Sequence, residues 1–142
     1  MIRGLHHVNI VTSDAGKAAE FFGLFGFDVS ERKELSGKWI DEVTGLENVS
    51  ALYIGLRHPE SETAVELLQY LHPAGTIPPS LPEPNAAGIR HLAFKVDDIE
   101  EEMARLGKYG VEFFSPLQVN PYGKKMVYLK GPDGIILELA EF

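Results

Sequence analysis

Two histidines and two glutamates hold matching positions in the two halves of this 142-residue chain. His7 and His91 are 84 residues apart, and each lies in an alternating polar and apolar segment that is typical of a half-buried strand. Glu66 and Glu138 are 72 residues apart, and each is a single carboxylate among aliphatic residues, where a charge is costly unless it is paired. Imidazole and carboxylate together suit zinc, nickel, cobalt, iron or manganese, so the four residues predict one divalent metal site.

Taken one at a time, these residues could each be an ordinary exposed side chain of a strand. Their equivalence in the two halves is what favours the ligand hypothesis. His6 is the alternative to His7, but the alternation of the strand places it on the same face as Val8 and Ile10.

An internal repeat supports the equivalence of the two halves. Five residues of the first half return in the second without a gap: Gly4, His7, Asp14, Gly23 and Gly26 correspond to Gly88, His91, Asp98, Gly107 and Gly110. Aspartate is a good helix N-cap and glycine a common helix end, so each half is predicted to open with a strand and a helix. The predicted strands are 5–11 and 89–96, and the predicted helices are 15–25 and 98–108.

The other predicted elements complete two similar modules. The first half has further strands at 27–33, 49–56 and 63–70, with an irregular segment at 34–48. The second has strands at 111–115, 125–130 and 135–142. Five prolines between 72 and 87 predict an extended linker. We therefore predict an α+β fold of one domain, 1–142, with modules at 1–71 and 88–142.

Composition narrows the classes of partner. The net charge of −8 argues against nucleic-acid binding, which needs a concentrated basic face. No apolar run is long enough for a membrane span, and no signal peptide is recognisable at the start. The absence of cysteine excludes thiolate ligands and disulfides. A cytoplasmic protein without membrane or nucleic-acid partners is expected.

Four segments resemble the vicinal oxygen chelate superfamily, which includes glyoxalase I, methylmalonyl-CoA epimerase, bleomycin-resistance proteins and extradiol dioxygenases. The segments are His7–Ile10, Val65–Leu68, Gly88–Asp98 and Gly131–Leu139, and they span nearly the whole chain. The resemblance implies paired βαβββ modules with curved sheets around a divalent metal. It carries the ligand roles onto His7, Glu66, His91 and Glu138.

Within that superfamily, a His–Glu–His–Glu set is most similar to bacterial glyoxalase I and the epimerase. Glyoxalases carry an arginine four residues after the first ligand, where it binds the glutathione carboxylate, and this chain has Val11 there. The adjacent Lys124 and Lys125 could meet the phosphates of CoA or belong to a solvated loop.

The metal set predicts a lyase or isomerase acting on a small-molecule carbonyl substrate. The cation would stabilise an enediolate or enolate while Glu66 or Glu138 removes the neighbouring proton. The alternative is a binding protein of the bleomycin-resistance type without turnover, with a crevice lined by Trp39, Tyr53, Phe113, Phe114, Tyr122 and Tyr128. A homodimer is expected in either case, because sheet edges of so short a chain need a cover.

Overall fold

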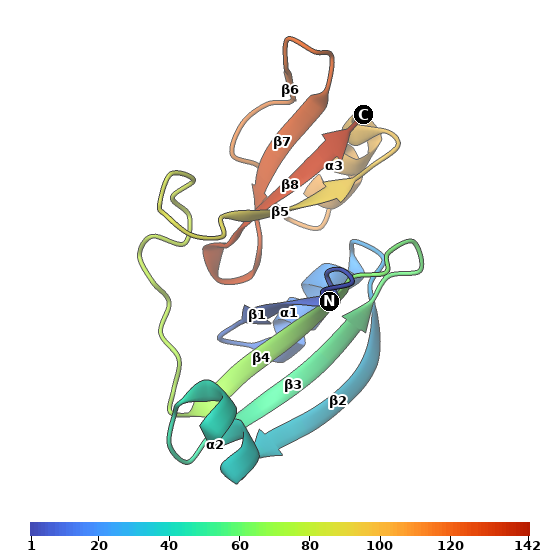
Figure 1. The fold of residues 1–142 in the computed structure, drawn as a ribbon. Coiled ribbons are helices and arrows are strands. Elements are labelled where there is room, and N and C mark those ends of the chain that lie inside the picture. Colours follow the sequence, from blue (N-terminus) through green and yellow to red (C-terminus); the bar gives the residue numbers. More distant parts are fainter. The chain divides into compact units, whose positions relative to one another are not determined.

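The structure is a computed structural model that describes residues 1–142 and divides into two compact units, Met1–Ile77 and Pro78–Phe142 (Figure 1). The boundary between the units falls within the proline-rich segment 72–87. Each unit holds one four-stranded mixed sheet, and the chain has three α-helices in all. None of these helices has the length and apolar character needed to cross a membrane. The predicted α+β fold is confirmed.

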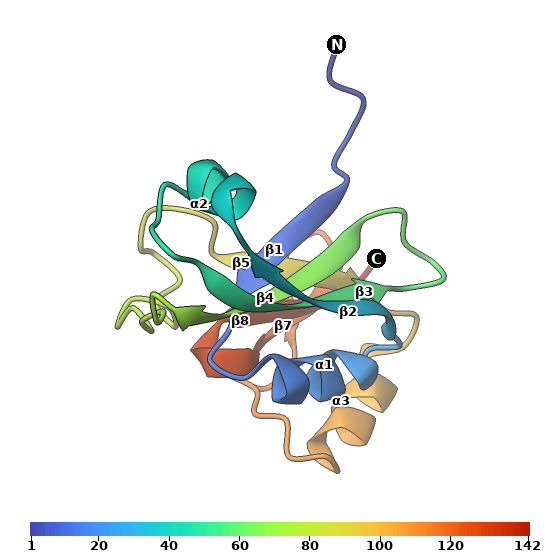
Figure 2. The ribbon, with the colours of Figure 1, turned by 90° about the horizontal axis from the view of Figure 1, so that it is seen from below.

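The first unit contains β1 (His7–Val11), α1 (Ala15–Gly23), β2 (Asp28–Ser36), α2 (Lys38–Thr44), β3 (Ser50–Arg57) and β4 (Ala64–His72). Its sheet has the order β1-β4-β3-β2, in which β1 runs parallel to β4 and the other pairs are antiparallel. Helix α1 lies against β3 and β4 on one face of this sheet (Figure 2).

The second unit repeats this plan. It contains β5 (His91–Lys95), α3 (Ile99–Gly107), β6 (Gln118–Val119), β7 (Lys125–Lys130), a 3₁₀ turn at Pro132–Gly134 and β8 (Ile136–Glu141). The sheet order is β5-β8-β7-β6, again with one parallel pair, β5 and β8.

The repeat seen in the sequence is confirmed in the backbone. The Asp14 and Asp98 side chains accept hydrogen bonds from the N–H groups of Lys17 (3.0 Å) and Glu101 (2.9 Å) at the starts of α1 and α3. After each helix the chain turns at a glycine with positive φ, +86° at Gly26 and +81° at Gly110. A side chain at such a φ is strained, so glycine is the residue this turn requires.

The alternation of each strand places apolar residues on the face that the helix covers. In the second unit this face buries Leu129, Leu137 and Leu139 of the sheet with Ile99 and Leu106 of α3. The intervening residues of the same strands, including Glu138, therefore lie on the opposite face. The ligand candidates thus lie on the face of each sheet opposite to α1 or α3, and in the first unit this face also carries Leu68, which packs against Ile40 of α2.

The prediction that 34–48 is irregular is wrong. Strand β2 continues to Ser36, and α2 begins after Gly37 and ends at Gly45, whose φ is +72°. The helix has seven residues and no side-chain cap at its start, so local signals are weak. It is held by Ile40, which packs in a cluster of buried residues: Leu35, Ile40, Val49, Ala51 and Leu68.

The predicted strand at 111–115 is also wrong. The pairing of this segment with β7 is limited to a β-bridge between Phe113 and Leu129, and the regular strand on this side of β7 is the short β6. Proline at 116 lacks the N–H that a continuous ladder needs.

The proline-rich segment is not extended throughout. Its turns are closed by hydrogen bonds from Leu81 N–H to the Pro78 carbonyl and from Glu83 N–H to the Ser80 carbonyl. The Arg90 guanidinium also donates to the carbonyl oxygens of Ser80 and Glu83.

Candidate functional site

The first histidine and glutamate meet on the sheet of the first unit. The parallel register of β1 and β4 sets Asn9 opposite Glu66, with His7 two residues earlier on the same face. The Nε2 atom of His7 lies 3.3 Å from Oε2 of Glu66. The predicted pair is therefore assembled within one sheet.

His6 is not a substitute for His7 but its neighbour. The Nδ1 atoms of the two rings are 2.8 Å apart. One imidazole must donate in this contact and the other accept. Because Nδ1 of His7 is engaged there, Nε2 is the atom that faces Glu66.

Tyr53 of β3 holds the other oxygen of the Glu66 carboxylate. Its hydroxyl donates to Oε1 of Glu66 at 3.0 Å. Burial raises the pKa of the Tyr53 phenol to about 12, and the hydrogen bond to Glu66 and the negative charges of Glu66 and Glu31 act in the same direction. The phenol therefore stays protonated near neutral pH and can donate this hydrogen bond.

The second pair occupies the equivalent place in the second unit. His91 lies on β5 and Glu138 on β8, and their Nε2 and Oε2 atoms are 3.0 Å apart. Glu138 is only 5% exposed, so its charge needs partners. The second partner is Lys124, whose Nζ lies 3.5 Å from Oε1 of Glu138. The ring of Tyr128 lies 5.0 Å from that of His91.

Each pair has the spacing of two ligands of one ion. Two atoms about 2.1 Å from a cation, at angles between about 90° and 110°, are roughly 3.0–3.4 Å apart. The observed distances of 3.3 Å and 3.0 Å fit this range, and the nitrogen and oxygen donors are those that zinc, nickel, cobalt, iron and manganese accept. A hydrogen bond has a similar length, so each pair is also stable in the absence of an ion.

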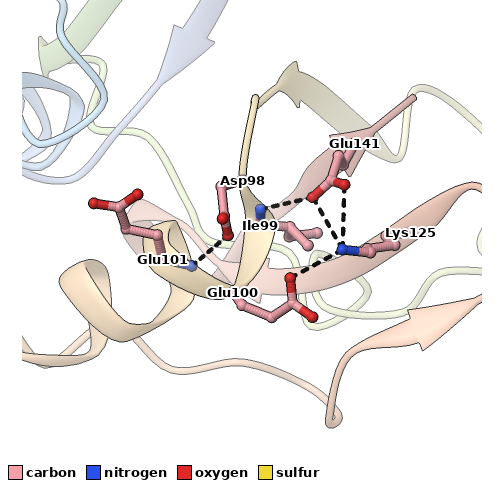
Figure 3. A network of polar contacts seen from close by, with 6 residues as sticks. All are labelled: Asp98, Ile99, Glu100, Glu101, Lys125 and Glu141. Atoms are coloured by element: carbon pink, nitrogen blue, oxygen red, sulfur yellow. Dashed lines mark hydrogen bonds and ion pairs between the residues drawn. The ribbon is translucent and has the colours of Figure 1, made fainter.

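A further group of carboxylates in the second unit already has partners within the protein. Ligand oxygens of Asp98, Glu100 and Glu141 lie within 4.8 Å of one another. The Lys125 ammonium lies 2.9 Å from Glu100 and 3.2 Å from Glu141, and Glu141 also accepts from the Ile99 N–H (Figure 3). Hydrogen bonds to Glu100 and Glu141 raise the pKa of Lys125. The cation of this group is the lysine, and the cluster connects α3 to β7 and β8.

The adjacent Lys124 and Lys125 therefore make contacts with different carboxylates. Lys124 contacts Glu138, whereas Lys125 belongs to the network of Glu100 and Glu141.

The aromatic residues predicted for a binding crevice do not share one environment. Trp39 on α2 is 57% exposed and Tyr122 is 94% exposed, and Phe114 is also exposed. Tyr53, Phe113 and Tyr128 are half-buried in their own units.

Sequence reasoning missed Tyr53 as the partner of Glu66 and Lys124 as the partner of Glu138. Both residues were recognisable by type, but their contacts depend on strand register and loop course. Tyr53 is paired with Leu68 and Gly55 with Glu66, and no spacing within β3 alone gives that register.

Comparison with known proteins shows the superfamily to which this chain belongs. Residues 4–139 match the model of the Glyoxalase/Bleomycin resistance protein/Dioxygenase superfamily. The chain belongs to this superfamily, and the predicted resemblance is confirmed.

Individual relatives cover nearly the whole chain. It is 30% identical to the mitochondrial methylmalonyl-CoA epimerase of Dictyostelium discoideum over 96% of its own length and 77% of the relative's. It is 28% identical to the uncharacterized protein YaeR of Escherichia coli, over 99% of this chain and 97% of that one. Among solved structures, a glyoxalase family protein from Bacillus cereus has a TM-score of 0.89 and 30% identity, with 99% of this chain and 95% of that chain covered.

Proposed function

We propose that this protein is a metal-dependent lyase or isomerase of the glyoxalase I and epimerase type, acting on a small carbonyl compound. His7 and Glu66 of the first unit and His91 and Glu138 of the second would be the ligands of a divalent cation. The observation that carries the proposal is the pairing of an imidazole with a carboxylate, at 3.3 Å and at 3.0 Å, at equivalent places of the two units.

The relatives support the reaction class. The superfamily includes enzymes, and the Dictyostelium relative is named as a methylmalonyl-CoA epimerase. Epimerisation next to a carbonyl and glyoxalase-type isomerisation share one step, the removal of a proton from the carbon beside that carbonyl. The proposal concerns this shared step.

The roles of the side chains follow from their contacts. When bound, the cation would supply Lewis-acid stabilisation of negative charge on the carbonyl oxygen. His7 and His91 would present Nε2 as ligands, each ring fixed by its neighbour, His6 in one case and Tyr128 in the other. Glu138 is only 5% exposed, and such burial strengthens its electrostatic interactions with a nearby cation.

Glu138 is the better candidate for the proton acceptor. The Lys124 ammonium lies within 3.5 Å of its Oε1 atom, so the carboxylate retains a positive partner if it turns toward a substrate proton. Glu66 has only the neutral Tyr53 hydroxyl on its other oxygen. Glu66 would therefore stay a ligand while Glu138 moves the proton.

Proton exchange in heavy water tests the proposal. Protein loaded with cobalt or nickel should exchange the proton beside the carbonyl of a small α-hydroxy-carbonyl compound or an acyl thioester, followed by NMR. Chelator-treated protein should not. Glu138→Gln should lower the exchange rate by about 100-fold or more, the usual contribution of a positioned general base.

Two controls make the result specific. Glu112→Gln changes an exposed carboxylate of the same unit that pairs with Lys130, and it should retain the rate. The His91→Ala variant should contain no bound metal when it is measured by elemental analysis. A protein that takes up no divalent cation, or one that exchanges equally well after chelation, would refute the proposal.

The second candidate is a small-molecule binding protein without turnover, of the bleomycin-resistance type. The exposure of Trp39 and Tyr122 favours it, since aromatic rings bind flat ligands well. Trp39 is the only tryptophan, so its fluorescence reports directly on binding near α2. Tight binding of an aromatic ligand by chelator-treated protein, without any proton exchange, would establish this function instead.

A further inference from the structure

The Glu66 carboxylate is held by two different side chains, one at each oxygen. Oε2 faces Nε2 of His7 at 3.3 Å, and Oε1 accepts from the Tyr53 hydroxyl at 3.0 Å. A carboxylate with one oxygen fixed in this way cannot rotate freely about its terminal bond. Oε2 is therefore kept on the side of the histidine.

The absence of a side chain at Gly55 leaves room for the Tyr53 phenol to reach Glu66. Gly55 is the register partner of Glu66, and Tyr53 lies two residues earlier on the same face of β3. A Cβ at position 55 would lie 3.1 Å from the Tyr53 hydroxyl oxygen and 2.8 Å from Oγ of Ser30. An alanine there would displace one of these side chains, so the glycine permits the diagonal contact.

The ring of Tyr53 is itself fixed on both sides. It packs against the buried cluster of Leu35, Ile40, Val49, Ala51 and Leu68. The Lys33 ammonium lies 4.8 Å from the ring centroid, on the strand next to β3, and it also pairs with Glu31 at 3.3 Å. A side chain locked by packing in this way delivers its hydroxyl to one place.

The second unit has no counterpart of Tyr53. The register partner of Glu138 is Tyr128, and the residue two positions earlier on β7 is Met126, which has no strong donor. Glu138 is held instead by Lys124. The fold repeat alone therefore does not require a tyrosine at position 53.

We propose that Tyr53 is a positioning residue, which holds Glu66 in its metal-binding conformation through a hydrogen bond that passes over Gly55. This inference rests on the proposed function, since it takes Glu66 to be a ligand. A neutral donor suits this place because it orients the carboxylate without bringing a second positive charge to it. Removing such a partner of a ligand typically weakens metal binding by about 10- to 100-fold.

Cobalt binding tests the role of the hydroxyl. Tyr53→Phe removes only that group and should weaken Co²⁺ binding, measured by isothermal titration calorimetry, by about 10-fold or more. The visible absorption of the Co²⁺ protein should shift as well, because the geometry of the ligands changes. The matched control is Tyr70→Phe, a half-buried tyrosine on β4 of the same sheet, which packs against the same cluster and should match the wild type in both readouts.

Gly55→Ala gives a second, independent arm. If alanine acts by displacing the phenol, the double variant with Tyr53→Phe should bind Co²⁺ about as well as Tyr53→Phe alone, so that the two effects do not add. Additive losses would show that Gly55 acts through something other than Tyr53.

The outcomes separate this inference from the proposed function. If the wild type and Tyr53→Phe bind Co²⁺ within twofold and with the same spectrum, the role of Tyr53 is refuted while the metal site stands. If the wild type binds no Co²⁺, both proposals fall. A third outcome is that Tyr53→Phe and Tyr70→Phe lose Co²⁺ affinity equally, with an unchanged Co²⁺ spectrum. The loss would then come from general packing, and the positioning role is refuted.

Discussion

The carboxylates Glu66 and Glu138 are equivalent in the repeat but different in their surroundings. Glu138 is almost fully buried between an imidazole and the Lys124 ammonium, whereas Glu66 is half-buried between an imidazole and a phenol. The ammonium brings a positive charge to Oε1 of Glu138, whereas the phenol at Oε1 of Glu66 is neutral. If both carboxylates are metal ligands, as we propose, Glu138 would release the ion more readily, and this difference is the reason for proposing it as the proton acceptor.

Gln69 and Glu141 are also equivalent in the repeat, but only Glu141 carries a charge. This difference predicts how the stability of the protein depends on pH. Gln69 accepts from the Ala15 N–H at the start of α1, and Glu141 accepts from the Ile99 N–H at the start of α3, both at 2.9 Å. The bond from Ile99 lowers the pKa of the Glu141 carboxyl below its usual value, and Lys125 acts in the same direction. A lowered pKa contributes stability above the unfolded-state value of about 4.3, and this contribution is lost as pH falls through the folded-state value.

Glu141→Gln reproduces the arrangement of the first unit and should flatten this dependence. The amide can still accept from Ile99, but it does not titrate. Urea unfolding between pH 7 and pH 3 should show the midpoint of the wild type falling more steeply than that of the variant. NMR titration of Lys125→Met should show the Glu141 pKa moving upward toward its usual value. Parallel pH profiles for the wild type and Glu141→Gln would contradict the prediction.

At the scale of elements, each unit docks one helix on its sheet with the same three devices. These are an aspartate cap, a side-chain acceptor from the last strand and a glycine turn after the helix. The acceptor ties the start of the helix to the strand that carries the proposed ligand, Glu66 or Glu138. The helix therefore supports the strand from the face opposite to the site.

Two glycines near the end of α3 should respond oppositely to alanine. Gly107 is helical and a Cβ there meets nothing within 4 Å, so Gly107→Ala should stabilise the protein by about 0.5–1 kcal/mol. Gly110 has φ +81°, and Gly110→Ala should destabilise it by about 1–2 kcal/mol. Urea unfolding measures both. Equal effects at the two positions would show that backbone conformation does not determine the turn.

At the scale of the whole molecule, each sheet leaves strand edges to be covered. β1 and β5, with five residues each, are the outer strands on the side of the parallel pairs. The outer strand β2 of the first unit has nine residues and is rich in charge, which discourages pairing with other chains. The short, less charged outer strands are the ones that a partner is expected to cover.

We expect a homodimer in solution. Sedimentation equilibrium at micromolar concentration should give about twice the 15.7 kDa mass of one chain. A particle of 15.7 kDa would contradict this and would leave the edges to be covered within a single chain.

The sequence by itself determined the features that depend on a few neighbouring residues. Alternation of period two gave β1, β3, β4, β5, β7 and β8, and the aspartate and glycine signals gave α1 and α3. Repeat equivalence also selected the histidines and glutamates that the structure pairs as His7 with Glu66 and His91 with Glu138. Both kinds of signal can be read along the chain, since they need no knowledge of which strands are neighbours.

Only the tertiary structure decided what lies across the strands. Helix α2 forms because Ile40 is buried in a cluster and Asp41 accepts from the N–H groups of Asn48 and Val49, neither of which has a periodic signal. Likewise the neighbours of the ligand candidates, Tyr53 and Lys124, are set by the register of β3 on β4 and by the course of the loop before β7. A shift of one residue in that register would turn Tyr53 to the other face of the sheet, and side-chain type alone cannot fix it.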